Sequence, residues 1–425
     1  MSANGSDNGA FSLSLNQSGA SVSGQALFDG SPCFSGGVFS GSVSGSALHG
    51  TVADGVVRAN LDASINGSAM NGTYTVPSGG ACTGDSVSFA LSNKPPPTPS
   101  SRLYVRASGS DSNSGANPAI ALRTISKAAD IARSGSTIVV GPGTYQEGVT
   151  TVVALQDLTF LADASGQQTG DAPGAVVLDG TAADAEVGFN LSNSLRTLIA
   201  GFTITGFSDA GIVIKSASDN LRVQNCVISG NSGDGIRVQD SASVLIFDNL
   251  IYGNGGAGVA IAGAVSGSPN ADVINNTIVG NQVRGLTVGT STRASPGAFV
   301  HNNIFQDNGQ DVSIKVFAPP PSNVPNSTVG YQADFNLVLP SAYLPSTIEG
   351  RHDIALDAQF VNADAGDFHL RSTSPAIDAG DSLNGMPDLR AILRTMTTTG
   401  GGACDKSALD LGYHYPATRC TATGP

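Results

Sequence analysis

Short apolar runs separated by polar corner residues repeat along the middle of the chain. Four aligned copies start at Val223, Ile246, Val273 and Val300: V-Q-N-C-V-I-S-G-N, I-F-D-N-L-I-Y-G-N, V-I-N-N-T-I-V-G-N and V-H-N-N-I-F-Q-D-N. Alternating Val and Ile interrupted by Gly, Asn and Asp indicate β-strands rather than helices. Successive copies are 23 to 27 residues apart, which predicts a solenoid built from one short set of strands per repeat.

The spacing inside each copy predicts where the chain turns. Two apolar columns, represented by Val223 and Ile228, lie five residues apart, whereas inward positions on one straight strand differ by an even number. The strand must therefore bend between them, and Asn tolerates the left-handed backbone of a sharp bend. We expect corner and ladder roles inside a parallel β-helix, rather than ligand binding, for three polar columns: Asn225, Asp248, Asn275 and Asn302; Cys226, Asn249, Asn276 and Asn303; and Asn231, Asn254, Asn281 and Asn308.

The pattern changes along the chain and predicts an all-β protein with several parts. Residues 1–93 contain short alternating runs joined by Gly, Asn and Ser, which predict a small antiparallel β-barrel or sandwich, either a ligand-binding module or a side-chain-filled spacer. Residues 94–101 form a Pro-rich linker. We expect residues 102–145 to form a cap and the first coil, with a helix that begins after Thr124. Residues 146–317 are predicted to form the parallel β-helix coils. Residues 318–425 are predicted to form the last β-helix coils and a disulfide-bonded tail.

Composition narrows the classes of function. The 425 residues carry a net charge of −13, so the chain offers no basic surface for nucleic acid. No apolar run reaches the roughly 20 residues of a transmembrane helix. The first residues, M-S-A-N-G-S-D-N-G, are polar, and we expect that a secretion signal or lipid-anchor segment has been removed.

Five cysteines indicate an oxidising compartment. Cys33 and Cys82 share the N-terminal module, and Cys404 and Cys420 share the tail, so we predict one disulfide in each pair. Cys226 falls in an inward column and is predicted to be a small buried apolar residue.

Two stretches resemble a known family. The segment from Tyr104, Y-V-R-A-S-G-S-D-S-N-S-G, together with G-S-T-I-V-V-G-P-G-T-Y-Q-E, resembles the N-terminal cap of bacterial right-handed parallel β-helix proteins of the pectate-lyase-like superfamily. The later S-P-A-I-D-A-G-D and D-L-G-Y-H-Y resemble the choice-of-anchor Q type of C-terminal region. Residues 1–93 are similar to small β-barrel domains of bacterial lipoproteins. The resemblance implies a secreted or surface-displayed protein and leaves its activity open, because the superfamily includes lyases, hydrolases, epimerases and non-catalytic members.

Outward side chains on the strand after each repeat Gly are the candidates for chemistry. Lys215 and Arg237, on two neighbouring coils and offset by one outward position, are the only cations predicted on this face. Asn190, Ser192 and Gln239 are polar neighbours that could contact a substrate. Family lyases use a Lys or Arg base beside a uronate carboxylate, which the resemblance transfers to Lys215 and Arg237 as a hypothesis. The alternative is that both are solvated surface cations.

Three acidic residues precede that strand in near register: Glu186, Asp209 and Asp234. Carboxylates gathered on one side of a solenoid could bind calcium or act as an acid and base pair. The alternative is that they are ordinary corner residues, and the dense Asp cluster of calcium-dependent lyases is not evident.

Two functions follow from the sequence. The first is a secreted or cell-surface protein that binds, and could cleave, an extracellular polysaccharide or cell-surface glycan. The second is a non-catalytic structural, adhesive or filament-forming surface protein that self-assembles, which is favoured by the low charge content and the Pro-rich spacer.

Overall fold

The computed structural model of the chain divides into two compact units, residues 1–98 and 99–425. The structure describes residues 10–29, 36–53, 58–66, 69–78, 84, 86–92, 102–151, 155–183, 185–216, 218–240, 242–263, 269–290, 296–316, 330–338, 343–344, 350–383, 386–406 and 408–417. Cys33, Cys82 and Cys420 lie outside these residues, so both predicted disulfides stay predictions.

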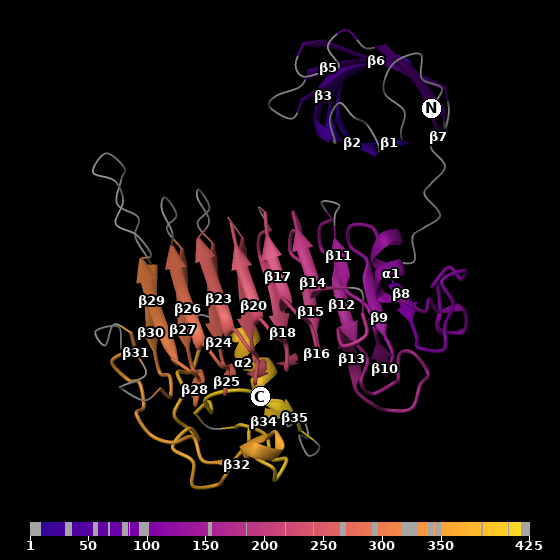
Figure 1. Cartoon of the computed structure of the whole chain (residues 1–425). Helices are drawn as coiled ribbons and strands as arrows, with labels where there is room; N and C mark the ends of the chain where they lie inside the picture. The colour runs from indigo at the N-terminus through magenta and orange to yellow at the C-terminus, as the bar shows by residue number, and fades with distance from the viewer. Residues whose placement is uncertain are drawn as a thin grey trace, which may run out of the picture. The chain divides into compact units, whose positions relative to one another are not determined.

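The N-terminal unit is one antiparallel sheet whose strands follow sequence order (Figure 1). Its strands are β1 (Ala10–Ser18), β2 (Ser21–Asp29), β3 (Gly36–Ser44), β4 (Ala47–Ala53), β5 (Arg58–Asn66), β6 (Ala69–Ser78) and β7 (Ser86–Ser92). One face buries its own core, which includes Phe39, Leu61 and Tyr74. The predicted antiparallel module is confirmed, but no pairing between β1 and β7 closes it within the described residues.

The second unit is a parallel solenoid of three sheets, which we number in the order in which each coil visits them. Sheet I contains β8 (Arg102–Val105), β9 (Thr137–Val140), β12 (Thr159–Ala162), β15 (Leu198–Ala200), β18 (Leu221–Gln224), β21 (Ser243–Phe247), β24 (Asn270–Ile274), β27 (Gly297–His301) and β30 (Gly330–Asp334). Sheet II contains β10 (Gly143–Tyr145), β13 (Val176–Asp179), β16 (Thr203–Thr205), β19 (Val227–Ser229), β22 (Leu250–Tyr252), β25 (Thr277–Val279) and β28 (Ile304–Gln306). Sheet III contains β11 (Val149–Thr151), β14 (Val187–Ser192), β17 (Ala210–Lys215), β20 (Asp234–Gln239), β23 (Ala257–Gly263), β26 (Arg284–Thr290), β29 (Val312–Val316) and β31 (Tyr343–Leu344).

The corners and ladders lie where the odd spacing predicts them. Asn225, Asp248, Asn275 and Asn302 all adopt a positive φ between 51° and 60°, which turns the chain from sheet I to sheet II. Asn249, Asn276 and Asn303 then form a buried ladder, in which each Nδ2 donates to the Oδ1 of the next coil at 3.0 Å. The second ladder, from Asn231 through Asn254 and Asn281 to Asn308, follows the same rule at 2.9 Å per step.

Cys226 occupies the first rung of the ladder that continues through Asn249. Its backbone N–H donates to Asn249 Oδ1 at 3.0 Å, and its side chain is fully buried. Burial raises the pKa of the Cys226 thiol to about 12, so the group is an inert apolar residue, as predicted.

A cap closes the first end of the solenoid. It includes the 3₁₀ turn η1 (Pro118–Ile120) and helix α1 (Ile125–Ile131). Thr124 is the N-cap, as predicted, because its Oγ1 accepts a hydrogen bond from Lys127 N at 3.2 Å. Ile125, Ala128 and Ala129 face the solenoid core and shield its first strands from water.

The C-terminal segment runs back along the solenoid instead of adding regular coils (Figure 1). It includes β32 (Phe360–Asn362), the 3₁₀ turn η4 (Ala363–Ala365), β33 (Asp367–Leu370), α2 (Pro387–Leu393), β34 (Met396–Thr397) and β35 (Tyr415–Pro416). Phe360, Phe368 and Tyr413 pack on the outward side chains of sheet II, such as Leu250. Leu389 and Leu393 of α2 pack on Phe247 and Ile274 of sheet I.

A buried charged group fastens this segment to the coils. The side chains of His414, Asp248 and Asp405 are 0%, 0% and 2% exposed. His414 Nε2 lies 3.0 Å from Asp405 Oδ2, its Nδ1 lies 3.0 Å from the carbonyl oxygen of Gly412, and its backbone N–H donates to Asp248 Oδ1 at 2.6 Å. Because both ring nitrogens face acceptors, His414 is an imidazolium.

In the three coils that begin at Val223, Ile246 and Val273, length varies at one corner only. Fifteen residues separate Val223 from Val238, and the equivalent steps from Ile246 to Ile261 and from Val273 to Val288 are identical. The remaining steps, from sheet III to the next strand of sheet I, are eight residues after Val238 but twelve after Ile261 and Val288.

Candidate functional site

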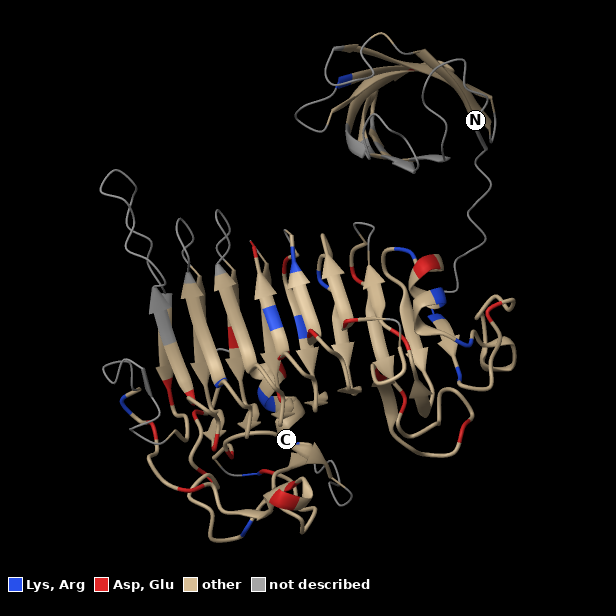
Figure 2. Ribbon diagram, in the orientation of Figure 1, with Lys and Arg blue, Asp and Glu red and all other residues tan. Residues whose placement is uncertain are grey.

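The outer face of sheet III carries the side chains that the sequence singled out. The described C-terminal segment packs on sheet II and on part of sheet I, and it leaves the outer face of sheet III free (Figure 1). Charged residues are sparse on the solenoid strands and gather in the turns and the C-terminal segment (Figure 2).

Strand register places the predicted residues in two outward columns. Ser192 pairs with Lys215, and Gln239 occupies the same column on the next coil. Asn190 pairs with Val213, which in turn pairs with Arg237. Lys215 and Arg237 therefore lie on adjacent coils, offset by one outward position as predicted.

The guanidinium of Arg237 is fully engaged by two carboxylates. Its Nη1 and Nη2 donate to Asp209 at 3.0 and 2.9 Å, and its Nε donates to Asp234 at 2.7 Å. Burial by itself lowers the pKa of Arg237, but these hydrogen bonds and charges outweigh it and raise the pKa. A guanidinium held in this state does not accept a proton, so we interpret Arg237 as a positioning group for Asp209 and Asp234, and its predicted role as a base stays a prediction.

The same contacts bear on the calcium hypothesis. Asp234 Oδ1 accepts from Ala257 N at 2.8 Å, so all four carboxylate oxygens of Asp209 and Asp234 already accept hydrogen bonds. Glu186 is exposed and does not converge on them. Calcium at this trio stays a prediction, and it would have to displace Arg237.

Another acidic group lies beneath the C-terminal segment. Asp378, Asp405 and Asp410 bring carboxylate oxygens within 4.8 Å of one another, a grouping that the sequence did not predict. Asp410 accepts from Asp378 N and from the hydroxyl of Thr398, and Asp405 accepts from Asp410 N and faces the His414 imidazolium. Protein donors thus occupy the carboxylates of Asp405 and Asp410, and we interpret the group as structural.

Lys215 differs from Arg237 because its ammonium has no ion pair or side-chain hydrogen bond within the described residues. The column continues on the next two coils through Ala262 and Gly289.

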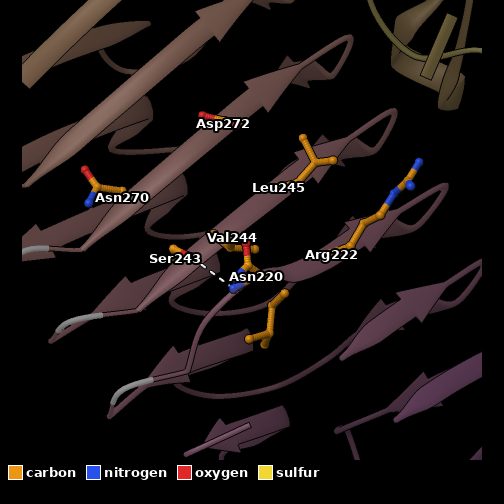
Figure 3. A pocket seen from close by; sticks show the side chains of 8 residues that line it. Asn220, Arg222, Ser243, Val244, Leu245, Asn270 and Asp272 are labelled. Atoms are coloured by element: carbon orange, nitrogen blue, oxygen red, sulfur yellow. Dashed lines mark hydrogen bonds between the residues drawn. The ribbon is translucent and has the colours of Figure 1, made fainter. Parts of the chain in front are cut away.

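A groove on sheet I was also missed. It encloses about 430 Å³ on three successive coils, β18, β21 and β24 (Figure 3). One side is the outward column Arg222, Leu245 and Asp272, and the other is Asn220, Ser243 and Asn270. The sequence predicts that these side chains point outward, because they alternate with the inward residues Val223, Ile246 and Val273, but alternation does not predict that they line a groove.

The charged residues of this groove are held differently. Arg222 extends away from Asn220 and Ser243 (Figure 3) and lies over the Phe247 ring at 5.2 Å, with its Nε and Nη2 buried. The carboxylate of Asp272 has no hydrogen-bond partner within the described residues. Surrounding protein atoms partly desolvate it, which raises the pKa of Asp272 although the residue remains exposed to solvent.

Residues 163–278 match the family described as the right handed beta helix region. The solenoid is a right-handed β-helix. This confirms the predicted architecture of the central coils, and the match ends before the C-terminal segment. No sequence among the curated proteins gives a significant match to this β-helix chain.

Solved structures with a similar chain path are remote. A pectate lyase, Pel9A, is 17% identical over 73% of this chain and 95% of its own, with a TM-score of 0.37. A complex of XylC with xylose is 12% identical over 57% of this chain and 66% of that one, with a TM-score of 0.37. A pectin methylesterase from carrot is 12% identical over 57% and 76%, with a TM-score of 0.30. These likenesses concern the β-helix fold and not its chemistry.

Proposed function

We propose that this β-helix protein binds an extracellular polysaccharide along the outer face of sheet III and does not cleave it. The observation that carries the proposal is the ammonium of Lys215, which has no ion-pair partner in the part of the chain that the structure describes and lies between the polar Ser192 and Gln239 in one outward column. The coils repeat at roughly 4.8 Å, so the column offers regularly spaced polar contacts to an extended chain.

An acidic polysaccharide fits this column better than a neutral one. Lys215 can pair with a ligand carboxylate, because the nearest predicted acids, Asp209 and Asp234, are both paired with Arg237. The net charge of −13 opposes a polyanion at long range, so binding is expected to depend on this local contact.

The contacts of Arg237 argue against cleavage. A lyase base must accept a proton from the substrate, and the three ion-pair hydrogen bonds of Arg237 keep it protonated. Lys215 alone lacks the second group that would stabilise a developing enolate within the described residues. Binding without turnover is therefore the better-supported hypothesis.

The test is affinity electrophoresis in gels that contain polygalacturonate, alginate or a neutral glucan. The wild-type chain should be retarded by an acidic polysaccharide, and Lys215→Gln should remove most of the retardation. Lys127→Gln, which removes one positive charge from the cap, is the matched control and should behave as wild type. Retardation that survives Lys215→Gln would overturn the assignment of this face, and release of unsaturated products or reducing ends would overturn the absence of cleavage.

A passive surface scaffold is the second candidate. It is favoured by the two buried asparagine ladders, which stiffen the coils without offering any group to a ligand. A scaffold that self-assembles should form concentration-dependent oligomers in light scattering and should bind none of the polysaccharides.

A further inference from the structure

We infer that the groove on sheet I is a second binding site, for a neutral oligosaccharide that lies parallel to the solenoid axis. This site is distinct from the face of Lys215, because sheets I and III are different walls of the coil. It does not depend on the function proposed for sheet III.

The shape of the groove defines how a ligand would lie. Its two sides are outward columns two residues apart on the same strands, and its floor is the backbone at Leu221 and Val244, whose side chains point into the core. A volume of about 430 Å³ lies within the range of small-molecule sites. Because the groove crosses three coils, an extended ligand would meet one residue of each column on every coil.

The lining offers the groups that recognise sugar hydroxyls. Leu245 stands between Arg222 and Asp272 and gives a small apolar surface (Figure 3). Asp272 is a carboxylate acceptor without a partner within the described residues, and such an acceptor is suited to one or two hydroxyl donors. Asn220 and Ser243 on the opposite side already bond to Asp219, which holds that side in place.

Charge decides between a neutral and an acidic ligand. The guanidinium of Arg222 lies over Phe247 with its Nε and Nη2 buried, so at most its Nη1 faces a ligand in the groove. Against this one nitrogen stand two carboxylates, that of Asp272 and that of Asp219 beside the opposite column. Both carboxylates repel a polyuronate, whereas hydroxyl groups satisfy them.

The experiment is isothermal titration of the full chain with β-1,4-linked hexasaccharides of glucose, xylose and mannose, and with hexasaccharides of galacturonate and glucosamine. Three variants separate the two faces: Asp272→Ala, Asp272→Asn, which keeps the side-chain shape, and Lys215→Gln. Thermal unfolding of each variant shows that it is folded.

At least one neutral hexasaccharide should bind to wild type and to Lys215→Gln equally. Asp272→Ala should weaken that binding about tenfold, the cost of a lost charge-assisted hydrogen bond, and Asp272→Asn should weaken it less. The inference is overturned if no neutral hexasaccharide binds, if both Asp272 variants bind as wild type, or if only glucosamine hexasaccharide binds. If galacturonate hexasaccharide binds and only Lys215→Gln abolishes that binding, the ligand occupies the face of sheet III. That result tests the proposed function and not the groove on sheet I.

Discussion

At the residue scale, His414 is a buried histidine whose surroundings keep its ring protonated. Burial by itself lowers the pKa of His414, but hydrogen bonds and attraction from Asp248 and Asp405 outweigh it and raise the pKa to about 10. The unfolded histidine titrates near about 6.5. The folded state therefore binds the ring proton of His414 more tightly than the unfolded state does. The stability that the charged His414 contributes is complete below a pH of about 6.5 and is lost as the pH rises through about 10.

We expect His414→Gln to destabilise the protein by about 3–5 kcal/mol at neutral pH, because two buried carboxylates lose their counter-charge. The difference in unfolding free energy between wild type and the variant should shrink as the pH rises toward the pKa of His414. Urea unfolding at a series of pH values measures it. His352→Gln, whose side chain is 50% exposed, is the control and should change little. A difference that does not vary with pH would contradict the charge assignment.

Arg237 is predicted to contribute to stability rather than to turnover. Arg237→Ala leaves Asp209 and Asp234 without their cation, and because Asp209 is 42% exposed, solvent screening limits the expected loss to about 1–2 kcal/mol. Chemical denaturation at low and high salt measures it, and the loss should be smaller at high salt. Lys215→Ala should change stability by less than about 0.5 kcal/mol. Equal effects of the two substitutions would refute the ion-pair interpretation.

At the element scale, the asparagine ladders were predictable and the C-terminal segment was not. The odd interval between Val223 and Ile228 fixes a bend without any knowledge of tertiary contacts, and the repeat then fixes which residues stack. The covering of sheet II by Phe360 and Tyr413 depends on long-range packing of a segment that has no repeat. For the same reason, alternation predicts that Asp209 and Arg237 lie near each other, but not that they form an ion pair.

The ladder leads to a paired prediction. Asn276→Ala removes a rung that donates to Asn303 and accepts from Asn249, and it should cost about 1–3 kcal/mol because buried partners are left unpaired. Cys226→Asn instead adds a rung, because its amide could donate to Asn249 Oδ1, which the Cys226 backbone already contacts. The Cys226→Asn protein should melt at or above the wild-type temperature. A clear fall in its melting temperature would show that the ladder cannot be extended at this end.

At the scale of the whole molecule, the two units have separate hydrophobic cores. We therefore expect two calorimetric transitions, one for residues 1–98 and one for the β-helix. Leu61→Ala, at a fully buried position of the N-terminal sheet, should lower one transition only, by about 2–5 kcal/mol in unfolding free energy. A shift of both transitions would indicate that the units unfold together.

The predicted disulfides also belong to this scale. Peptide mapping without reduction should recover Cys33 linked to Cys82 and Cys404 linked to Cys420, while Cys226 remains a thiol. Recovery of a peptide that joins Cys226 to another cysteine would contradict its burial in the ladder.

In the three coils that begin at Val223, Ile246 and Val273, the fifteen-residue interval is constant and length varies only in the step from sheet III to sheet I. These coils accommodate several extra residues at that step because both asparagine ladders lie at the other two corners. A chain of this kind can therefore lengthen or replace the loops at that corner, and alter what borders the faces of Lys215 and Asp272, without rebuilding the ladders. The same corner is where a foreign epitope could be grafted with least harm to folding.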